Sequence, residues 1–175
     1  MAEILDSGSR RTFITGAVRD DREGKGRFDL VPLVNVGRWK IYEQDRIHQA
    51  TSSDIPYEAH LYIQIGKFLY DGNQEHLYEC LCTLAQEVFK STDVALLNVT
   101  KHYENGLIKY GERNWEKGIP VHSYIDSACR HLCKYHMNYT DEPHELAFIW
   151  NILCCLWTLD NCDESLIDVP YKNKL

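Results

Sequence analysis

The sequence predicts an all-α protein, a helical bundle with an irregular N-terminal arm. Apolar residues recur every three or four positions through most of the chain after residue 32, which is the spacing of one helix face. No segment shows a convincing two-residue alternation of apolar and polar side chains, the pattern of a half-buried strand. The 175 residues suit one compact domain, and short connections between the periodic segments favour a bundle.

The positions of glycine and proline, together with the spacing of apolar residues, predict where each element begins and ends. Residues 1–32 contain five Gly or Pro positions and little helical period, so we expect an irregular arm there. A helical domain is expected over residues 33–160, and a loose polar tail over 161–175. Helices are predicted over residues 33–49, 56–70, 75–90, 93–110, 123–137 and 141–159.

The last of these helices differs from the others. It is almost wholly apolar from Leu146 onward, and a helix that is apolar on every side usually lies at the centre of a bundle. Asp141 is the expected N-cap, with Pro143 tolerated in the first turn. Gly111 is expected to end the helix over residues 93–110.

Charge and cysteine usage limit the classes of partner. The net charge of -7 argues against binding a nucleic-acid polymer or an anionic membrane, but it leaves a nucleotide ligand open, because a few local cations hold a phosphate. No run of apolar residues is long enough to span a bilayer, and the N-terminus has no apolar signal core. We therefore expect a cytoplasmic protein whose seven cysteines are reduced thiols.

Acidic residues suggest a site for Mg²⁺ or Mn²⁺, which prefer carboxylate oxygens. Glu142 and Glu145 are three residues apart, so they would share one helix face. The expected metal ligands are Glu104, Asp141, Glu142 and Glu145, with Glu112 as a weaker candidate. The plainer interpretation of residues 141–145 is a set of carboxylates that gains from the dipole of a helix N-terminus.

The remaining candidates would hold a nucleotide. Phosphate is expected to contact Lys109, Arg113, Lys117 and Arg130, joined by Lys25 and Arg27 from the arm. The base is expected to contact Asn114, Trp115 or Asn151, and His131, His144 and Glu145 are the candidate catalytic residues. Each group also has a plainer interpretation. The cations around residue 115 could lie at a solvated helix end, Trp115 could be a core aromatic residue, and His131 could be a buried histidine with its hydrogen bonds satisfied. A zinc site at Cys129, His131 and Cys133 is a weaker hypothesis, since no second pair of cysteines is suitably spaced.

Several segments resemble a phage and prophage family labelled dATP/dGTP diphosphohydrolase, N-terminal domain. They are Thr15–Asp20, Gly24–Pro32, Lys109–Pro120, Asp126–His131, Asp141–Glu145 and Trp150-Asn151. The resemblance implies similarity to the all-α, MazG-type pyrophosphatases, which use ExxE and ExxD carboxylates with Mg²⁺. Glu142 and Glu145 look like the second motif, with Glu in place of the expected Asp. The first motif is not plainly present, because Leu107 stands three residues after Glu104.

Three functions remain open at this stage. The first is metal-dependent hydrolysis of a deoxypurine nucleoside triphosphate to the monophosphate and pyrophosphate, by a phage or prophage protein in a bacterial host. The second is a non-catalytic phage nucleotide-binding protein that sequesters a nucleotide immune signal. The third is a structural or interaction protein whose polar cluster only joins helices. Under the first two we expect a homo-oligomer, a dimer or larger.

Overall fold

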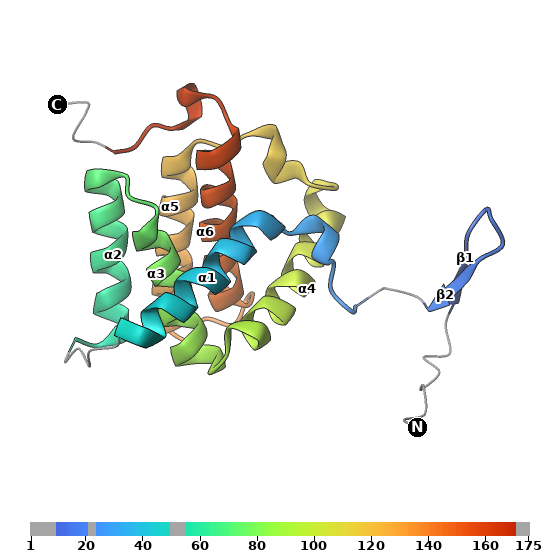
Figure 1. Ribbon diagram of the computed structural model, residues 1–175, viewed down its shortest axis with the longest axis horizontal. Coiled ribbons are helices and arrows are strands. Elements are labelled where there is room, and N and C mark those ends of the chain that lie inside the picture. The colour runs from blue at the N-terminus through green and yellow to red at the C-terminus, as the bar shows by residue number, and fades with distance from the viewer. Residues whose placement is uncertain (1–9, 21–23, 50–54, 171–175) are drawn as a thin grey trace.

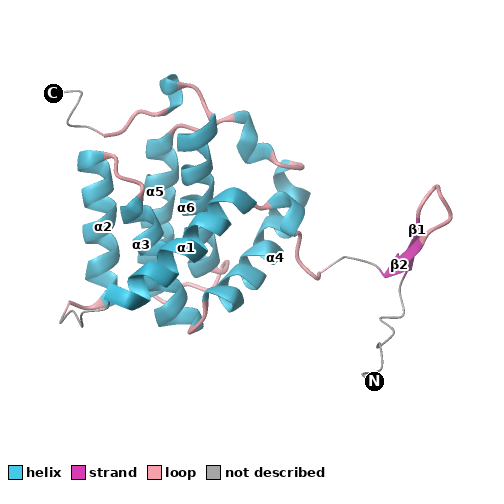
Figure 2. Ribbon diagram, in the orientation of Figure 1, coloured by secondary structure: helices cyan, strands magenta, loops and turns pink. Residues whose placement is uncertain are grey.

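The computed structural model describes residues 10–20, 24–49 and 55–170 (Figure 1). Its α-helices are α1 (Leu33–Gln49), α2 (Tyr57–Asp71), α3 (Glu75–Leu84), α4 (Thr92–Tyr110), α5 (Val121–His136) and α6 (His144–Asn161). A π-helical segment, η2 (Ala85–Phe89), continues α3, and short 3-10 turns are η1 (Phe28–Leu30), η3 (Asn114–Lys117) and η4 (Glu164–Leu166). The all-α prediction is confirmed (Figure 2). None of the described helices combines the length and hydrophobicity that crossing a membrane requires.

Helix α6 lies at the centre of the bundle, as its composition predicts. It packs against α1, α3, α4 and α5. Phe148, Ile149 and Cys154 project in three directions around the helix, yet each has an exposed fraction of 0%. Between residues 144 and 159 no side chain of α6 is exposed, so a buried polar residue in this part of the helix needs a hydrogen-bond partner inside the protein.

Several helix ends have identifiable causes. The Ser91 hydroxyl accepts a hydrogen bond from the Val94 amide and caps α4. At the other end of α4, the Gly111 amide donates to the Leu107 carbonyl with φ at +85°, a backbone conformation that favours glycine. Helix α6 begins at His144, three residues later than expected, with Pro143 as its N-cap residue. Glu142 therefore precedes the helix, and the predicted helical face shared with Glu145 does not exist.

The predicted irregular arm contains a hairpin. Strands β1 (Arg10–Thr12) and β2 (Val18–Asp20) pair antiparallel and stand apart from the helices (Figure 1). The turn between them contains Gly16, whose φ is +83°. Each strand has three residues, too few for a two-residue alternation to be recognised in a sequence. Residues 1–9 of the predicted arm lie outside the described residues.

The end of the arm is anchored to α4 by an internal anion. The Glu104 carboxylate accepts hydrogen bonds from the Gly24 amide at 3.1 Å and the Gly26 amide at 2.9 Å. Gly26 has φ at +86°, and a Cβ there would lie 2.2 Å from the Thr100 hydroxyl oxygen, so only glycine fits. The glycine loop thus binds an anion, and that anion is a carboxylate of the same chain.

The predicted loose tail is packed against the bundle as far as residue 170. Val169 has an exposed fraction of only 3%. Pro120 is the N-cap residue of α5 and gives no side-chain hydrogen bond. The Asp168 carboxylate supplies that cap from the tail, because it accepts a hydrogen bond from the His122 amide at 3.0 Å and also contacts the His122 imidazole. Residues 171–175 lie outside the described residues.

Replacing Asp168 with Ala should lower the free energy of unfolding by about 1 kcal/mol at pH 7, the usual cost of a lost N-cap. Partial burial opposes ionisation of Asp168, but the hydrogen bonds from His122 outweigh it and hold the pKa of that carboxyl below its ordinary value of 3.8. A depressed folded-state pKa means that the stabilisation is complete above pH 3.8 and disappears as the pH falls through the folded-state pKa. Urea unfolding of both proteins across this range checks the prediction. Equal stability at pH 7 would contradict it.

Candidate functional site

A cavity of about 370 Å³ lies between α4, α5, α6 and the loop that connects α4 to α5. This is within the size range of small-molecule sites. Three helices contribute most of its lining: His102, Tyr103, Gly106 and Leu107 from α4, Ser123, Tyr124, Ser127 and His131 from α5, and Ala147, Trp150 and Asn151 from α6. The connecting loop adds Arg113, Asn114, Trp115 and Ile119, and Glu142 lines the cavity just before α6.

Small residues at facing positions explain why the three helices leave room between them. Gly106, Ser127 and Ala147 come from three different helices, and all line the cavity. A Cβ added to Gly106 would meet no other atom within 4 Å. Protein interiors are otherwise closely packed. We therefore attribute the cavity to the small side chains that the sequence places at these three positions.

One wall of the cavity is aromatic. The Tyr103 ring meets Trp115 edge-on, with centroids 6.2 Å apart, and lies 6.0 Å from Trp150. Tyr124 approaches Trp150 from the other side at 6.2 Å. Trp115 is only 4% exposed, although it belongs to a loop. Aromatic rings held by one another in this way form a rigid surface for a flat, apolar group.

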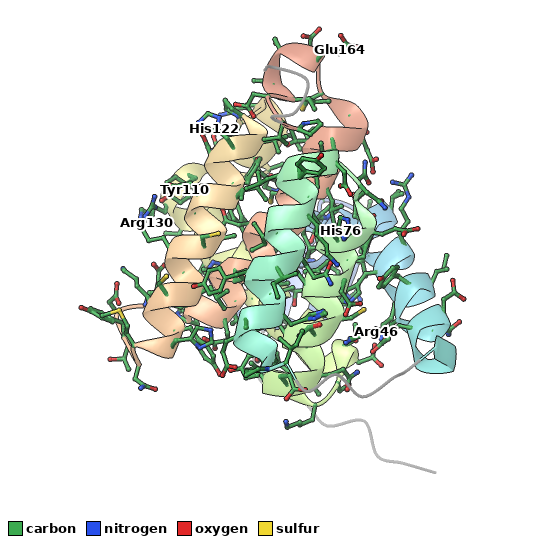
Figure 3. All side chains as sticks on the ribbon, turned by 90° about the vertical axis from the view of Figure 1, so that its left-hand side faces the viewer. Arg46, His76, Tyr110, His122, Arg130 and Glu164 are labelled. Atoms are coloured by element: carbon green, nitrogen blue, oxygen red, sulfur yellow. The ribbon has the colours of Figure 1, made fainter. Side chains whose placement is uncertain are left out.

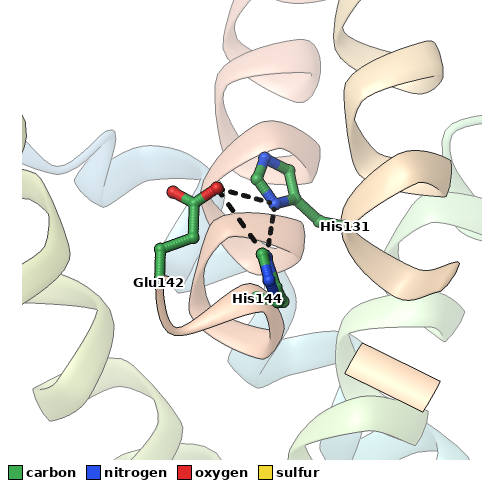
Figure 4. A group of neighbouring side chains, drawn as sticks. All are labelled: His131, Glu142 and His144. Carbon is green, nitrogen blue, oxygen red and sulfur yellow. Dashed lines mark hydrogen bonds and ion pairs between the residues drawn. The ribbon is translucent and has the colours of Figure 1, made fainter. Parts of the chain in front are cut away.

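Another part of the lining is polar. His131 and Glu142 line the cavity there, and His144, which is not part of the lining, converges with both of them (Figure 4). The Nδ1 atoms of His131 and His144 are 3.1 Å apart. One carboxylate oxygen of Glu142, Oε1, lies 3.5 Å from the first of these atoms and 3.7 Å from the second. His131 comes from α5, Glu142 from the turn before α6, and His144 from the first turn of α6.

A further carboxylate fixes the orientation of the His144 ring. Its Nε2 atom lies 2.9 Å from Oδ1 of Asp141, and Lys134 donates a hydrogen bond to the other oxygen of Asp141 at 2.9 Å. Hydrogen bonds from Lys134 and His144 lower the pKa of Asp141 to about 2. The carboxylate is therefore ionised and accepts the Nε2 proton of His144. It follows that Nδ1 of His144 presents a lone pair to the cluster.

Burial keeps the neighbouring imidazoles neutral. It lowers the pKa of His131 below the ordinary value of 6.5, and it outweighs the opposing effect of the Glu142 charge. The pKa of His102, which also lines the cavity, is lowered for the same reason. At pH 7 both rings therefore offer a lone pair together with a single N–H, as proton acceptors or metal ligands do.

Six of the predicted site residues line the cavity. Asn114, Trp115, His131, Glu142 and Asn151 all line the cavity. The buried Asn151 side chain donates from Nδ2 to the Ala147 carbonyl at 2.8 Å. Arg113, one of the expected phosphate partners, also lines the cavity, with its guanidinium 5.4 Å from the centre of the Trp115 ring.

The other expected phosphate partners lie elsewhere. Arg27 is 5% exposed and is paired with Asp29 at 2.5 Å and Glu112 at 3.2 Å. Arg130 pairs with Asp126 on the outer side of α5, where Figure 3 shows it projecting from the bundle. The exposed side chains of Lys25, Lys109 and Lys117 are not part of the cavity lining.

The four predicted metal carboxylates do not converge. Both oxygens of Glu104 accept backbone hydrogen bonds from the arm. The Asp141 oxygens face Lys134 and His144. Glu145 does not line the cavity. Of the four, Glu142 alone borders it, because α6 begins after Glu142 and the backbone takes its side chain in a different direction from that of Glu145.

Sequence reasoning missed His102, Ser127 and Trp150 as lining residues. A signal was present in helical spacing: His102 and Gly106 lie four apart on α4, and Ser123, Ser127 and His131 lie four apart on α5. Residues four apart share a helix face. Small or polar residues at that spacing, on helix faces that are otherwise apolar, indicate a cavity. The indication holds only if the face of α4 packs opposite the face of α5, which the sequence does not show.

Residues 92–168 match the model of a family described as dATP/dGTP diphosphohydrolase, N-terminal. The resemblance inferred from the sequence is confirmed over these residues, which run from the start of α4 to residue 168 in the tail. The match does not reach residues 15–32, so the resemblance expected for that segment stays a prediction. Among curated proteins and among solved structures, no match was found.

Replacement of Gly106 tests whether the space beside this position in α4 can accept a methyl group. Replacing Gly106 with Ala should raise the free energy of unfolding by about 0.5–1 kcal/mol, because glycine within a helix costs that much relative to alanine and the added methyl meets no atom. Thermal and urea unfolding measure the change. A lower stability would mean that the helix needs glycine at this position for a backbone reason.

Proposed function

We propose that this chain hydrolyses a deoxypurine nucleoside triphosphate to the monophosphate and pyrophosphate in the cavity between α4, α5 and α6. The observation that carries the proposal is the division of one cavity into an aromatic wall and a histidine–carboxylate cluster, inside the segment that matches the diphosphohydrolase family. A nucleotide has the same division, with a flat base at one end and charged phosphates at the other.

The aromatic wall is the proposed base site. Trp150 is only partly buried and offers ring surface to a purine, whose stacking on aromatic side chains is typically worth about 1–3 kcal/mol. The buried Trp115 lines the same cavity. Asn151 lies on the same helix as Trp150 and has one amide hydrogen bond to the backbone. Within the part of the chain that the structure describes, its carbonyl oxygen has no hydrogen-bond donor, so it is available to the edge of a base.

The phosphates would then lie toward the His131–Glu142 cluster, because the Arg113 guanidinium lies against Trp115 and is paired with Glu116. In the reaction, a water oxygen forms a bond to the α-phosphorus, the bond from that phosphorus to the bridging oxygen breaks, and pyrophosphate leaves. The water proton needs an acceptor. Glu142 is 41% exposed at its side chain and lines the cavity, so it is the proposed acceptor. His131, which also lines the cavity, would orient the water, and His144 would hold the His131 ring in place through their contact.

The expected Mg²⁺ enters most simply with the substrate. Mg²⁺ is usually bound through one or two carboxylates together with substrate phosphates. Glu142 is the one predicted metal carboxylate beside the cavity, so the described residues do not fit a preformed cage of four carboxylates. Bound Mg²⁺ would neutralise charge that develops on the phosphates.

The test is chromatographic analysis of products from dATP, dGTP, ATP, GTP and dCTP, each with Mg²⁺ or Mn²⁺. Monophosphate and pyrophosphate formed in equal amounts from the deoxypurine substrates support the proposal. A nucleotide that binds tightly and is recovered intact contradicts it, and would make sequestration without hydrolysis the better account.

Two variants of one sequence motif separate the site from its surroundings. Glu142→Gln should reduce turnover by about 100-fold or more, the usual contribution of a positioned proton acceptor. Glu145→Gln, three residues away and outside the cavity lining, should keep turnover within a few-fold. Circular dichroism spectra check that both variants fold. Equal losses in the two variants would contradict the assignment of Glu142.

A further inference from the structure

We propose that His131, Glu142 and His144 bind one divalent transition-metal ion, such as Zn²⁺, Mn²⁺ or Co²⁺, in preference to Mg²⁺. This identifies a metal site within the cavity of the proposed reaction, but binding of the ion alone does not depend on that reaction. Among the described residues, the ligand atoms of this one group of three converge to within 4.8 Å of one another.

The spacing of the three atoms suits a common metal ion. Metal–ligand bonds of about 2.0–2.2 Å arranged tetrahedrally place neighbouring ligand atoms roughly 3.3–3.5 Å apart. Here the separations are 3.1 Å between the two Nδ1 atoms, and 3.5 Å and 3.7 Å from these to Oε1 of Glu142. Shifts of a few tenths of an ångström would place all three around one ion.

Hydrogen bonding leaves one lone pair already directed into the cluster. His144 carries its proton on Nε2, toward Asp141, so its Nδ1 can only accept. Without an ion, His131 must hold its proton on Nδ1 to make the 3.1 Å contact favourable. When the ion binds, that proton moves to Nε2 of His131, and both Nδ1 lone pairs coordinate the metal without any change in the charge of the rings.

The surroundings are those of an oriented metal ligand. A carboxylate that accepts the second N–H of a ligating imidazole fixes its tautomer and increases its basicity. Asp141 does this for His144, and Lys134 holds Asp141 in turn. The His144 side chain is 0% exposed and that of His131 is 15% exposed, whereas Glu142 is 41% exposed. The site is thus closed on its histidine side and open toward the cavity, where water or a phosphate oxygen completes the coordination.

The donor atoms decide between classes of metal. Two imidazole nitrogens and one carboxylate oxygen suit Zn²⁺ and its first-row neighbours, whereas Mg²⁺ binds oxygen almost exclusively and releases its water reluctantly. This is the physical reason to separate the ion held by the protein from the Mg²⁺ that accompanies a nucleotide.

The experiment is titration of the chelator-treated full chain with Co²⁺ and Zn²⁺, without nucleotide, by calorimetry and by the visible absorption of bound Co²⁺. We expect one ion per chain, not displaced by a large excess of Mg²⁺. His131→Gln and Glu142→Gln should each weaken binding by more than about 100-fold, and Asp141→Asn by about 10–100-fold, the usual effect of losing an outer carboxylate.

Matched controls decide the outcome. His122→Gln and Glu145→Gln change the same residue types outside the cavity lining and should leave the affinity unchanged. Glu142 is exposed, so its variant tests the site even if His131→Gln fails to fold.

Three results would overturn the proposal. They are the absence of saturable binding, a near-ultraviolet thiolate absorption that marks cysteine ligands, and equal affinity in every variant. A metal site without nucleotide hydrolysis would overturn only the proposed function, and hydrolysis with Mg²⁺ in a chain that binds no Co²⁺ or Zn²⁺ would overturn only the metal site.

Discussion

The burial of α6 over most of its length is the constraint on which the rest of the structure depends. Between residues 144 and 159 none of its side chains is exposed, and because an unsatisfied buried polar group costs about 1–3 kcal/mol, buried polar residues on this helix gain from partners inside the protein. His144 and Asn151 are two such residues, seven positions apart and therefore on nearly the same face. His144 is satisfied by Asp141 and His131, and Asn151 by the Ala147 carbonyl. The polar groups in and beside the cavity thus occur at the few positions where the central helix carries a polar residue in place of an apolar one.

Charges near the arm illustrate how tertiary contacts redirect residues that look functional. Arg27 is buried, and a buried cation is stable only when it is paired and hydrogen-bonded. Asp29 and Glu112 pair with it, and the Glu104 carboxylate meets two glycine amides of the same loop. Together these contacts hold η1 against α4 and bring the buried Leu30 to the edge of the cavity. The charged residues of this region therefore support the wall of the cavity. Their hydrogen bonds and ion pairs are made within the protein and not with a ligand.

The cluster at the polar end joins the two proposals without making either depend on the other. An oriented histidine pair and a partly exposed carboxylate can position water directly, or through an ion that lowers the pKa of that water. In both cases Lys134 and Asp141 act through His144 by fixing its tautomer. His131 and Glu142 line the same cavity as the aromatic wall, so a bound molecule with a flat apolar part and an anionic part could meet both surfaces.

The sequence alone determined the all-α class, the approximate span of each helix and the central position of α6, because helical period and apolar content are local properties. It also indicated His131, Glu142, Trp115 and Asn151 as site residues. Only the tertiary structure decided which polar residues face one another. A start of α6 three residues later than expected separates Glu142 from Glu145, and docking of the arm removes Glu104 and Arg27 from the candidates for ligand binding. The docking of the arm depends on contacts between residues about 80 positions apart, and no local pattern records such contacts.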